Sequence, residues 1–287
     1  MADRGYCEEI VYIESEDGYQ LEGLVIRPAS SPARSSVVLW VHGHTGKFYE
    51  RHNVLAGREI ARQGFVFVSG NNRGHDFGTT LRVTGSERKL LAGGGWERLA
   101  ESPLDVGPWI DHAAGLAGGE GKVVLVGHSL GTLKVTYYQA LRQDPRVAGV
   151  VLASPPLGVR RRDPELTATA EVLVAAGRAR DLLPWGVSPA GAGTVSAETY
   201  LERYRPDMDI FGADSADSSL ARVRCPLLAI YGTDEAWVGS PADFATIRAR
   251  ATAAPRVDTL VVEGANHIYT GCEATVGAGI AAWAKEL

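Results

Sequence analysis

The sequence predicts an α/β protein with a mostly parallel β-sheet and helices on both faces of that sheet. Several short runs, such as residues 37–41, 65–68 and 123–126, are hydrophobic throughout, as expected of strands that are buried on both faces. Amphipathic segments with helical spacing separate these runs. Glycine or polar residues follow each run, and in open α/β sheets this edge is where ligands bind.

The N-terminal part of the chain predicts strands first. Residues 7–28 predict two strands that are joined by a turn at Asp17 and Gly18. Between the runs that begin at residues 37 and 65, a helix is expected over residues 50–64. Gly64 closes this segment and is a suitable residue for a helix C-terminus.

The strand and helix patterns continue along the chain. A helix is expected over residues 102–119, with Ser102 as its N-cap and Pro103 at its first helical position. Four later apolar runs predict strands, and they lie within residues 122–129, 147–156, 226–235 and 256–269. Helical patterns lie within residues 130–143, 240–254 and 271–287.

This alternation stops between residues 157 and 219. Residues 163–186 predict a helix that ends at Pro184, and residues 196–205 predict a short helix that Ser196 opens. We therefore expect a core domain of residues 1–156 and 220–287, and a helical cap or lid insertion of residues 157–219. A surface excursion without a role at the site is the alternative interpretation.

Composition and charge limit the class of protein. The 287-residue chain has a formal net charge of −5, whereas a nucleic-acid surface normally shows a basic excess. The N-terminus carries no apolar stretch of signal-peptide length, and no run approaches the ~18 apolar residues of a membrane helix. We therefore expect a cytoplasmic protein, monomeric or homodimeric, that acts on a small molecule without a nucleic-acid or membrane partner. Its three cysteines have no metal-site spacing and are expected to be free thiols: Cys7, Cys225 and Cys272.

The pentapeptide "GHSLG", residues 127–131, lies where an apolar run ends and a helical pattern begins. A sharp strand-to-helix turn of this kind strains the serine backbone and projects the hydroxyl of Ser129 outward. Gly127 and Gly131 suit the turn, because side chains there would collide with neighbouring backbone. The pentapeptide alone is common, but its strand–turn–helix context is typical of a nucleophile elbow. The alternative is a glycine-rich turn with an idle serine.

A serine nucleophile needs a base, which is usually a histidine that a carboxylate orients. In this architecture the acid and then the histidine follow the serine, each after a later strand. The turns "GTDE" and "EGANHIY" supply Asp234 and His267 in this order. Glu235 is an alternative acid, but the chain reaches Asp234 first after the apolar run. His267 could also be a turn histidine that only satisfies a backbone carbonyl.

Acyl transfer also needs hydrogen-bond donors for an oxyanion. The N–H of Leu130, directly after the nucleophile, is one predicted donor. A second is expected from the loop "HGHTG", where the amide of His44 is preferred and that of Thr45 comes next. His42 and His44 could also be a metal-binding pair, but no nearby carboxylate or cysteine completes a ligand set, so no metal is expected.

With these residues placed, the chain resembles the α/β-hydrolase fold superfamily over nearly its whole length. "HGHTG" looks like the oxyanion loop of that family, "GHSLG" like its nucleophile elbow, "GTDE" like its acid turn and "NHIY" like its histidine loop. The resemblance implies an eight-stranded, mostly parallel sheet and the hydrolysis of esters, thioesters, amides or similar bonds. "HGHTGKFYERHN" together with "NNRGHDFG" is also similar to esterase-like branches of the fold.

The sequence therefore predicts a cofactor-independent serine hydrolase that cleaves a carboxylic ester or thioester through an acyl-enzyme on Ser129. An acyltransferase or a C–C bond-cleaving enzyme with the same triad is one alternative, and a ligand-binding protein with little turnover is another. The candidate substrate-binding residues suggest a medium-sized, partly apolar or aromatic substrate. They are His128, Trp185, Tyr200, Phe211 and Trp237. The aromatic residues of the insertion could instead form a small core of their own.

Overall fold

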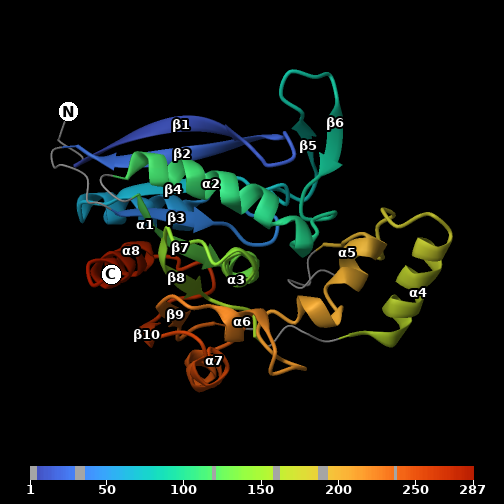
Figure 1. Cartoon of the computed structure of the whole chain (residues 1–287). Coiled ribbons are helices and arrows are strands. Elements are labelled where there is room, and N and C mark those ends of the chain that lie inside the picture. The colour runs from blue at the N-terminus through green and yellow to red at the C-terminus, as the bar shows by residue number, and fades with distance from the viewer. Residues whose placement is uncertain (1–4, 30–35, 118–120, 158–161, 187–192, 236–237) are drawn as a thin grey trace.

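The computed structural model describes residues 5–29, 36–117, 121–157, 162–186, 193–235 and 238–287. Eight strands form one sheet in the order β1-β2-β4-β3-β7-β8-β9-β10 (Figure 1). The β1–β2 and β2–β4 pairs are antiparallel, and all other neighbours are parallel, which confirms the predicted sheet. The strands are β1 (Tyr6–Glu14), β2 (Gln20–Pro28), β3 (Ser36–Val41), β4 (Val66–Gly70), β7 (Lys122–His128), β8 (Val147–Ala153), β9 (Leu227–Gly232) and β10 (Val257–Val262).

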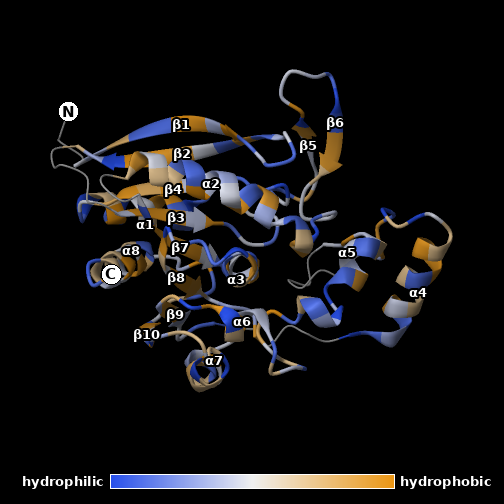
Figure 2. Cartoon of the chain, viewed as in Figure 1, coloured by the Kyte–Doolittle hydropathy of each residue, from blue (hydrophilic) through white to orange (hydrophobic). Residues whose placement is uncertain are grey.

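The central strands are buried on both faces, which explains their continuous hydrophobic runs. In β3, Val37 and Leu39 join one core cluster, while Val38 and Trp40 join the cluster on the opposite face. Figure 2 shows these central strands coloured mainly as hydrophobic. The first cluster includes residues of α2 (Pro103–Leu116), α3 (Leu130–Arg142), α6 (Ser219–Arg222) and α7 (Phe244–Arg250). The second includes residues of α1 (Arg51–Arg62) and α8 (Glu273–Ala284).

Two predicted helix ends can be compared with the structure. Gly64 follows α1 with a φ of +94°, and its N–H donates to Ala61, as a C-terminal glycine does. Ser102 does precede Pro103, but its hydroxyl donates to the carbonyl of Leu99 and caps no amide of α2. Ser102 thus holds the predicted N-cap position, but its side chain does not cap the helix, because a 3₁₀ turn, Leu99–Glu101, runs directly into α2.

A two-stranded hairpin extends from the sheet and was not expected from the sequence. It pairs β5 (Thr79–Arg82) with β6 (Lys89–Ala92) in antiparallel register. Its strands have four residues each and carry exposed polar side chains, so they lack the apolar run that identifies the central strands. Two further 3₁₀ turns occur at Pro206–Met208 and Pro241–Asp243.

The segment between β8 and α6 carries α4 (Pro164–Ala175) and α5 (Ala197–Glu202), at the right of Figure 1. Ser196 caps α5 as predicted, because its hydroxyl accepts the Thr199 N–H. The prediction that the first helix ends at Pro184 was wrong. Gly177, with a φ of +72°, ends α4 in a Schellman motif, in which the N–H of Arg178 donates to Leu173.

This segment has a small core of its own and is joined to the main body by hydrogen bonds. Its core cluster consists of Ala170, Leu183, Val195, Ala197 and Tyr200. The indole of Trp96 donates to the carbonyl of Arg180 at 2.9 Å, and Arg98 pairs with Glu202 at 3.2 Å. That the insertion acts as a lid stays a prediction. Among the described helices, none combines the length and the apolar character needed to cross a membrane.

Candidate active site

Ser129 lies between the end of β7 and the start of α3, in a strained backbone conformation with a φ of +55°. The neighbouring glycines have a steric explanation. A Cβ at Gly131 would lie 2.2 Å from the carbonyl oxygen of Val41, and one at Gly127 would lie 2.4 Å from that of Gly131. The structure therefore forms the sharp turn that the sequence predicts.

His267 lies beside Ser129. Its Nε2 is 3.0 Å from the serine Oγ, and its Nδ1 is 3.1 Å from Oε2 of Glu235. Since the carboxylate only accepts, Nδ1–H donates to Glu235, and Nε2 is left to accept the serine proton. A serine hydroxyl, an imidazole and a carboxylate are thus joined by two hydrogen bonds.

The carboxylate bonded to His267 is that of Glu235, whereas the sequence analysis preferred Asp234 as the acid. Asp234 is exposed in the turn after β9, and its N–H donates to the carbonyl of Ala265. The Glu235 side chain is only 1 % exposed and points inward to His267. The preference for Asp234 was wrong because the turn exposes that residue and brings the next one to the histidine.

Ser154 is bonded to this carboxylate and Tyr269 is bonded to Ser154, and the sequence analysis identified neither residue. The hydroxyl of Ser154 donates to Oε1 of Glu235, and it lies 2.7 Å from the hydroxyl of Tyr269. Both residues are buried and have positive φ angles. Ser154 directly follows the apolar run that forms β8, at the same sheet edge as Ser129, and this position was the available signal.

His128 connects the serine turn to the histidine loop. Its Nε2 donates to the carbonyl of His267 at 2.8 Å, and its ring stacks on Trp40. Burial lowers the pKa of His128 well below its usual value, and the nearby His52 lowers it further. The ring is therefore neutral, with its proton on Nε2.

The loop after β3 packs against the serine turn. A Cβ at Gly43 would lie 2.9 Å from the Cβ of Ser129 and 3.3 Å from the amide nitrogen of Leu130. Leu130, the first residue of α3, and His44 both line the cavity beside the serine. Thr45 does not line the cavity, and its backbone pairs with that of His75.

Both ring nitrogens of His42 are used within the protein. Nδ1 donates to the carbonyl of Gly43 at 2.8 Å, and Nε2 accepts the N–H of Asn72 at 2.9 Å. Burial lowers the pKa of His42 well below its usual value. The ring thus fixes the loop that leads to His44. In the described part of the chain, no group of three or more histidine, cysteine, aspartate or glutamate residues is placed to hold a metal ion.

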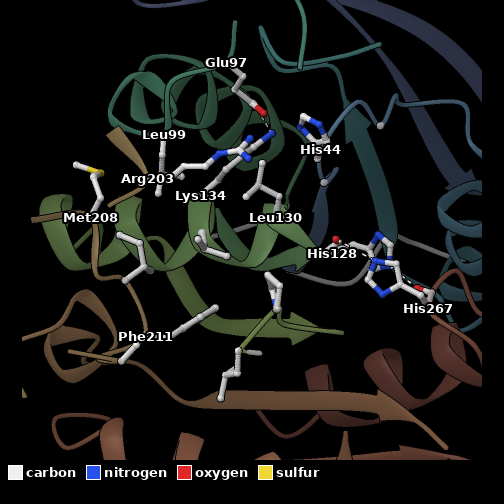
Figure 3. A pocket seen from close by; sticks show the side chains of 18 of the residues that line it. His44, Glu97, Leu99, His128, Leu130, Lys134, Arg203, Met208, Phe211 and His267 are labelled. Carbon is white, nitrogen blue, oxygen red and sulfur yellow. Dashed lines mark hydrogen bonds and ion pairs between the residues drawn. The ribbon is translucent and has the colours of Figure 1, made fainter. Parts of the chain in front are cut away.

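A cavity of about 450 Å³ opens onto Ser129 and His267 (Figure 3). Three predicted substrate-binding residues line it, namely His128, Tyr200 and Phe211. Trp185 does not line it, because its side chain is 72 % exposed and contacts Phe77 on the surface. Trp237, the fifth candidate, lies outside the described residues.

The cavity also contains charged residues that the sequence analysis did not identify. Lys134, Glu97 and Arg203 lie on the side of Leu130 away from His267 in Figure 3. The Nζ of Lys134 lies 2.5 Å from Oε1 of Glu97. A lysine in an amphipathic helix is normally expected on its solvent face, so the pattern gave no sign of this buried pair.

Solved structures with this fold share little sequence with the chain. Est1E from Butyrivibrio proteoclasticus, described with bound ferulic acid, has a TM-score of 0.66 at 17% identity, over 96% of this chain and 98% of its own. An esterase domain from a Rhodothermus marinus protein has a TM-score of 0.61 at 18% identity, over 98% of both chains. A hypothetical protein from Pseudomonas aeruginosa has a TM-score of 0.67 at 14% identity, over 100% of this chain and 95% of its own.

A search of curated protein sequences found no significant match. The family comparison is more direct, because residues 38–274 match the sequence model of the alpha/beta hydrolase family. The matched range contains the serine turn, Glu235 and His267, and it includes most of the eight-stranded sheet. This protein therefore belongs to the alpha/beta hydrolase family.

Proposed function

We propose that the protein hydrolyses carboxylic esters, or thioesters, through an acyl-enzyme on Ser129. The observation that carries this proposal is the chain of two hydrogen bonds from Ser129 through His267 to Glu235, at 3.0 Å and 3.1 Å. This is the arrangement by which a histidine activates a serine hydroxyl. Proteins of similar fold from Rhodothermus marinus and Pyrococcus furiosus are described as esterases, which agrees with the proposal.

Ser129, His267 and Glu235 each have a separate role in the proposed mechanism. His267 Nε2 takes the proton of Ser129 as Oγ attacks the ester carbonyl, and Glu235 stabilises the imidazolium that forms. His267 then gives the proton to the leaving alcohol, which departs as the acyl-enzyme forms. Water attacks the acyl group in the second half of the reaction, His267 again takes and returns a proton, and the acid product leaves.

The oxyanion of both tetrahedral intermediates needs donors beside Ser129. We assign one to the amide of Leu130, which lies at the N-terminus of α3, where backbone amides are available. We assign the second to the amide of His44, because it lines the cavity and follows Gly43, which packs against the serine turn. Thr45 is a weaker candidate because it does not line the cavity.

The cavity supports a medium-sized, partly apolar substrate. Tyr200 and Phe211 line it from the insertion, together with Leu133 of α3. Its volume of about 450 Å³ lies within the range for small-molecule pockets. Est1E is described with ferulic acid, an aromatic acid, so aromatic esters belong in a first substrate panel.

A fluorophosphonate probe tests the nucleophile, with intact mass as the readout. We expect one adduct on the wild-type protein and none on Ser129→Ala. Ser86→Ala is the matched control, because Ser86 is exposed in the β5–β6 turn, and it should label like wild type. Ester hydrolysis should disappear with the label in Ser129→Ala. Labelling or turnover that persists in a folded Ser129→Ala protein would refute the assignment.

A further inference from the structure

Beyond Leu130 the cavity is lined by charged side chains together with the apolar Leu99 and Met208. Figure 3 shows Glu97, Lys134 and Arg203 gathered there, while His128 and His267 lie on the other side of Leu130. Apolar side chains of Leu99, Leu133 and Met208 line the cavity too. A substrate whose ester group lies at Ser129 and which extends through the cavity would reach these charged groups.

Glu50, Asp209 and Arg250 also line the cavity, and among the charges gathered beyond Leu130 those of Lys134 and Glu97 compensate each other. Lys134 is fully buried, and its Nζ is paired with Glu97 and also donates to the carbonyl oxygen of His42 at 3.3 Å. Glu97 is 6 % exposed, and its second oxygen, Oε2, has no hydrogen-bond partner within the described part of the chain. The lysine and the glutamate together add no net charge to the cavity.

Arg203 has no such ion pair with any residue that the structure describes. Among the described residues, none is a hydrogen-bond partner for the buried Nη2 of Arg203, and no carboxylate lies within 4.0 Å of the guanidinium. Burial lowers the pKa of Arg203, while the charges of Glu97, Tyr204 and Glu202 act in the opposite direction. A guanidinium stays charged in proteins, and a buried charge is normally paired. The described part of the chain therefore supplies no carboxylate partner for the guanidinium of Arg203.

We propose that Arg203 binds a carboxylate at the non-reacting end of the ester substrate. The proposal rests on the proposed ester hydrolysis and specifies its substrate class: an ester with an apolar spacer and a terminal carboxylate. A carboxylate is the natural complement of a guanidinium, because it can accept two parallel N–H bonds and neutralises the charge. A hydroxyl would accept one bond and leave the charge uncompensated.

Matched ester pairs test this specificity. The first pair is the umbelliferyl monoester of suberic acid against umbelliferyl octanoate, with the carboxylate on the acyl side. The second is the acetate ester of para-(hydroxymethyl)benzoate against para-methylbenzyl acetate, with the carboxylate on the alcohol side. In at least one pair, kcat/KM of the wild-type enzyme should favour the carboxylate ester by about tenfold or more, as a charge-assisted hydrogen bond predicts.

Arg203→Met should remove this preference. We expect kcat/KM to fall by about 10- to 100-fold for the preferred carboxylate ester and to change little for its neutral partner. Arg203→Lys should keep part of the preference, because it keeps the charge without the two-pronged geometry. Arg205→Met is the matched control, since Arg205 is exposed and does not line the cavity, and it should behave like wild type.

Other outcomes would overturn the proposal in distinguishable ways. A wild-type preference for both neutral esters, or an equal loss on both members of a pair in Arg203→Met, would exclude a carboxylate site. A preference for the umbelliferyl ester of omega-hydroxyoctanoic acid over both suberate and octanoate would point to Glu97 as a hydroxyl acceptor instead.

A binding measurement separates this proposal from the proposed function. Calorimetry with the suberate monoester and the para-(hydroxymethyl)benzoate ester can use the Ser129→Ala protein, which should not turn them over. At least one should bind, and the additional change Arg203→Met should weaken that binding about tenfold or more. If the wild-type enzyme hydrolyses none of the esters, the proposed ester hydrolysis is wrong. The difference in binding between the two variants still tests whether Arg203 binds a carboxylate. Failure of both esters to bind, or binding that ignores Arg203, would exclude the site.

Discussion

Ser154 donates its hydroxyl hydrogen to the oxygen of Glu235 that His267 does not use. Since the carboxylate only accepts, the Ser154 hydroxyl must in turn accept from Tyr269, at 2.7 Å. Both carboxylate oxygens are therefore held, and the hydrogen-bonded chain runs from Tyr269 to Ser129. In the proposed mechanism Ser154 and Tyr269 are positioning residues, because their hydrogen bonds reach His267 only through Glu235.

The identity of the acid gives the first prediction. Glu235→Gln should lower kcat by about 1,000-fold or more, because the neutral amide no longer stabilises the imidazolium. Asp234→Asn is the matched control and should stay close to the wild-type rate, since Asp234 is exposed in the turn. Both variants are measured as kcat on one ester, with circular dichroism as the check of folding. Inactivation by Asp234→Asn alone would restore Asp234 as the acid.

The support of the acid gives the second prediction. Ser154→Ala should lower kcat by about tenfold with little change in KM, because one hydrogen bond to a charged group is lost while the substrate contacts remain. Tyr269→Phe should have a smaller effect, because the Ser154–Glu235 bond survives. Steady-state kinetics of both variants decides this order. A larger loss in Tyr269→Phe, or a loss that appears only in KM, would contradict the positioning role of Ser154.

The glycines of the serine turn give the third prediction. Gly131→Ala should lower the free energy of unfolding by about 3 kcal/mol, because its Cβ would lie 2.2 Å from a backbone oxygen that cannot easily move. Gly115→Ala is the control in α2, where the added Cβ meets nothing within 4 Å. It should instead stabilise the protein by about 0.5–1 kcal/mol through helix propensity. Urea unfolding midpoints measure both effects, and equal midpoints would refute the steric argument.

Buried histidines give a prediction about pH. Burial lowers the pKa of His42 and His128 well below the ordinary value, and that of His52 to about 4. The unfolded chain binds protons at these residues below a pH of about 6.5, whereas in the folded protein the same rings stay neutral until the pH is lower. Stability should therefore be fully present above this pH and should fall as the pH drops toward 4. Each histidine contributes up to about 1.4 kcal/mol per pH unit in that window.

Urea unfolding between a pH of about 7.5 and 5 measures this dependence, before most carboxylates titrate. His52→Gln should reduce the pH dependence of the free energy of unfolding by the contribution of one histidine, because it removes one group whose pKa is lowered in the folded state. A slope that is absent, or that His52→Gln leaves unchanged, would mean that these rings take up protons without unfolding.

The sequence predicts those parts of the site that depend on a short sequence motif or on the order of such motifs. The apolar runs identified the central strands, and the glycines around Ser129 identified the turn, because the steric demand at that turn acts between residues close in sequence or on an adjacent strand. The position of His267 followed from the order of motifs along the chain. Hydrophobic runs, glycine spacing and motif order are all visible in the sequence itself.

Tertiary structure alone decided which groups meet across the strand ends. Asp234 and Glu235 are adjacent and chemically alike, and only the course of the turn after β9 brings Glu235, rather than Asp234, to His267. Ser154 and Tyr269 are 115 positions apart in the chain, so no local pattern links them. Tertiary packing likewise places the charges of Lys134 and Arg203 at the cavity. Lys134 points inward from a helix, and the insertion places Arg203 near Glu97, so their buried environment exists only after packing.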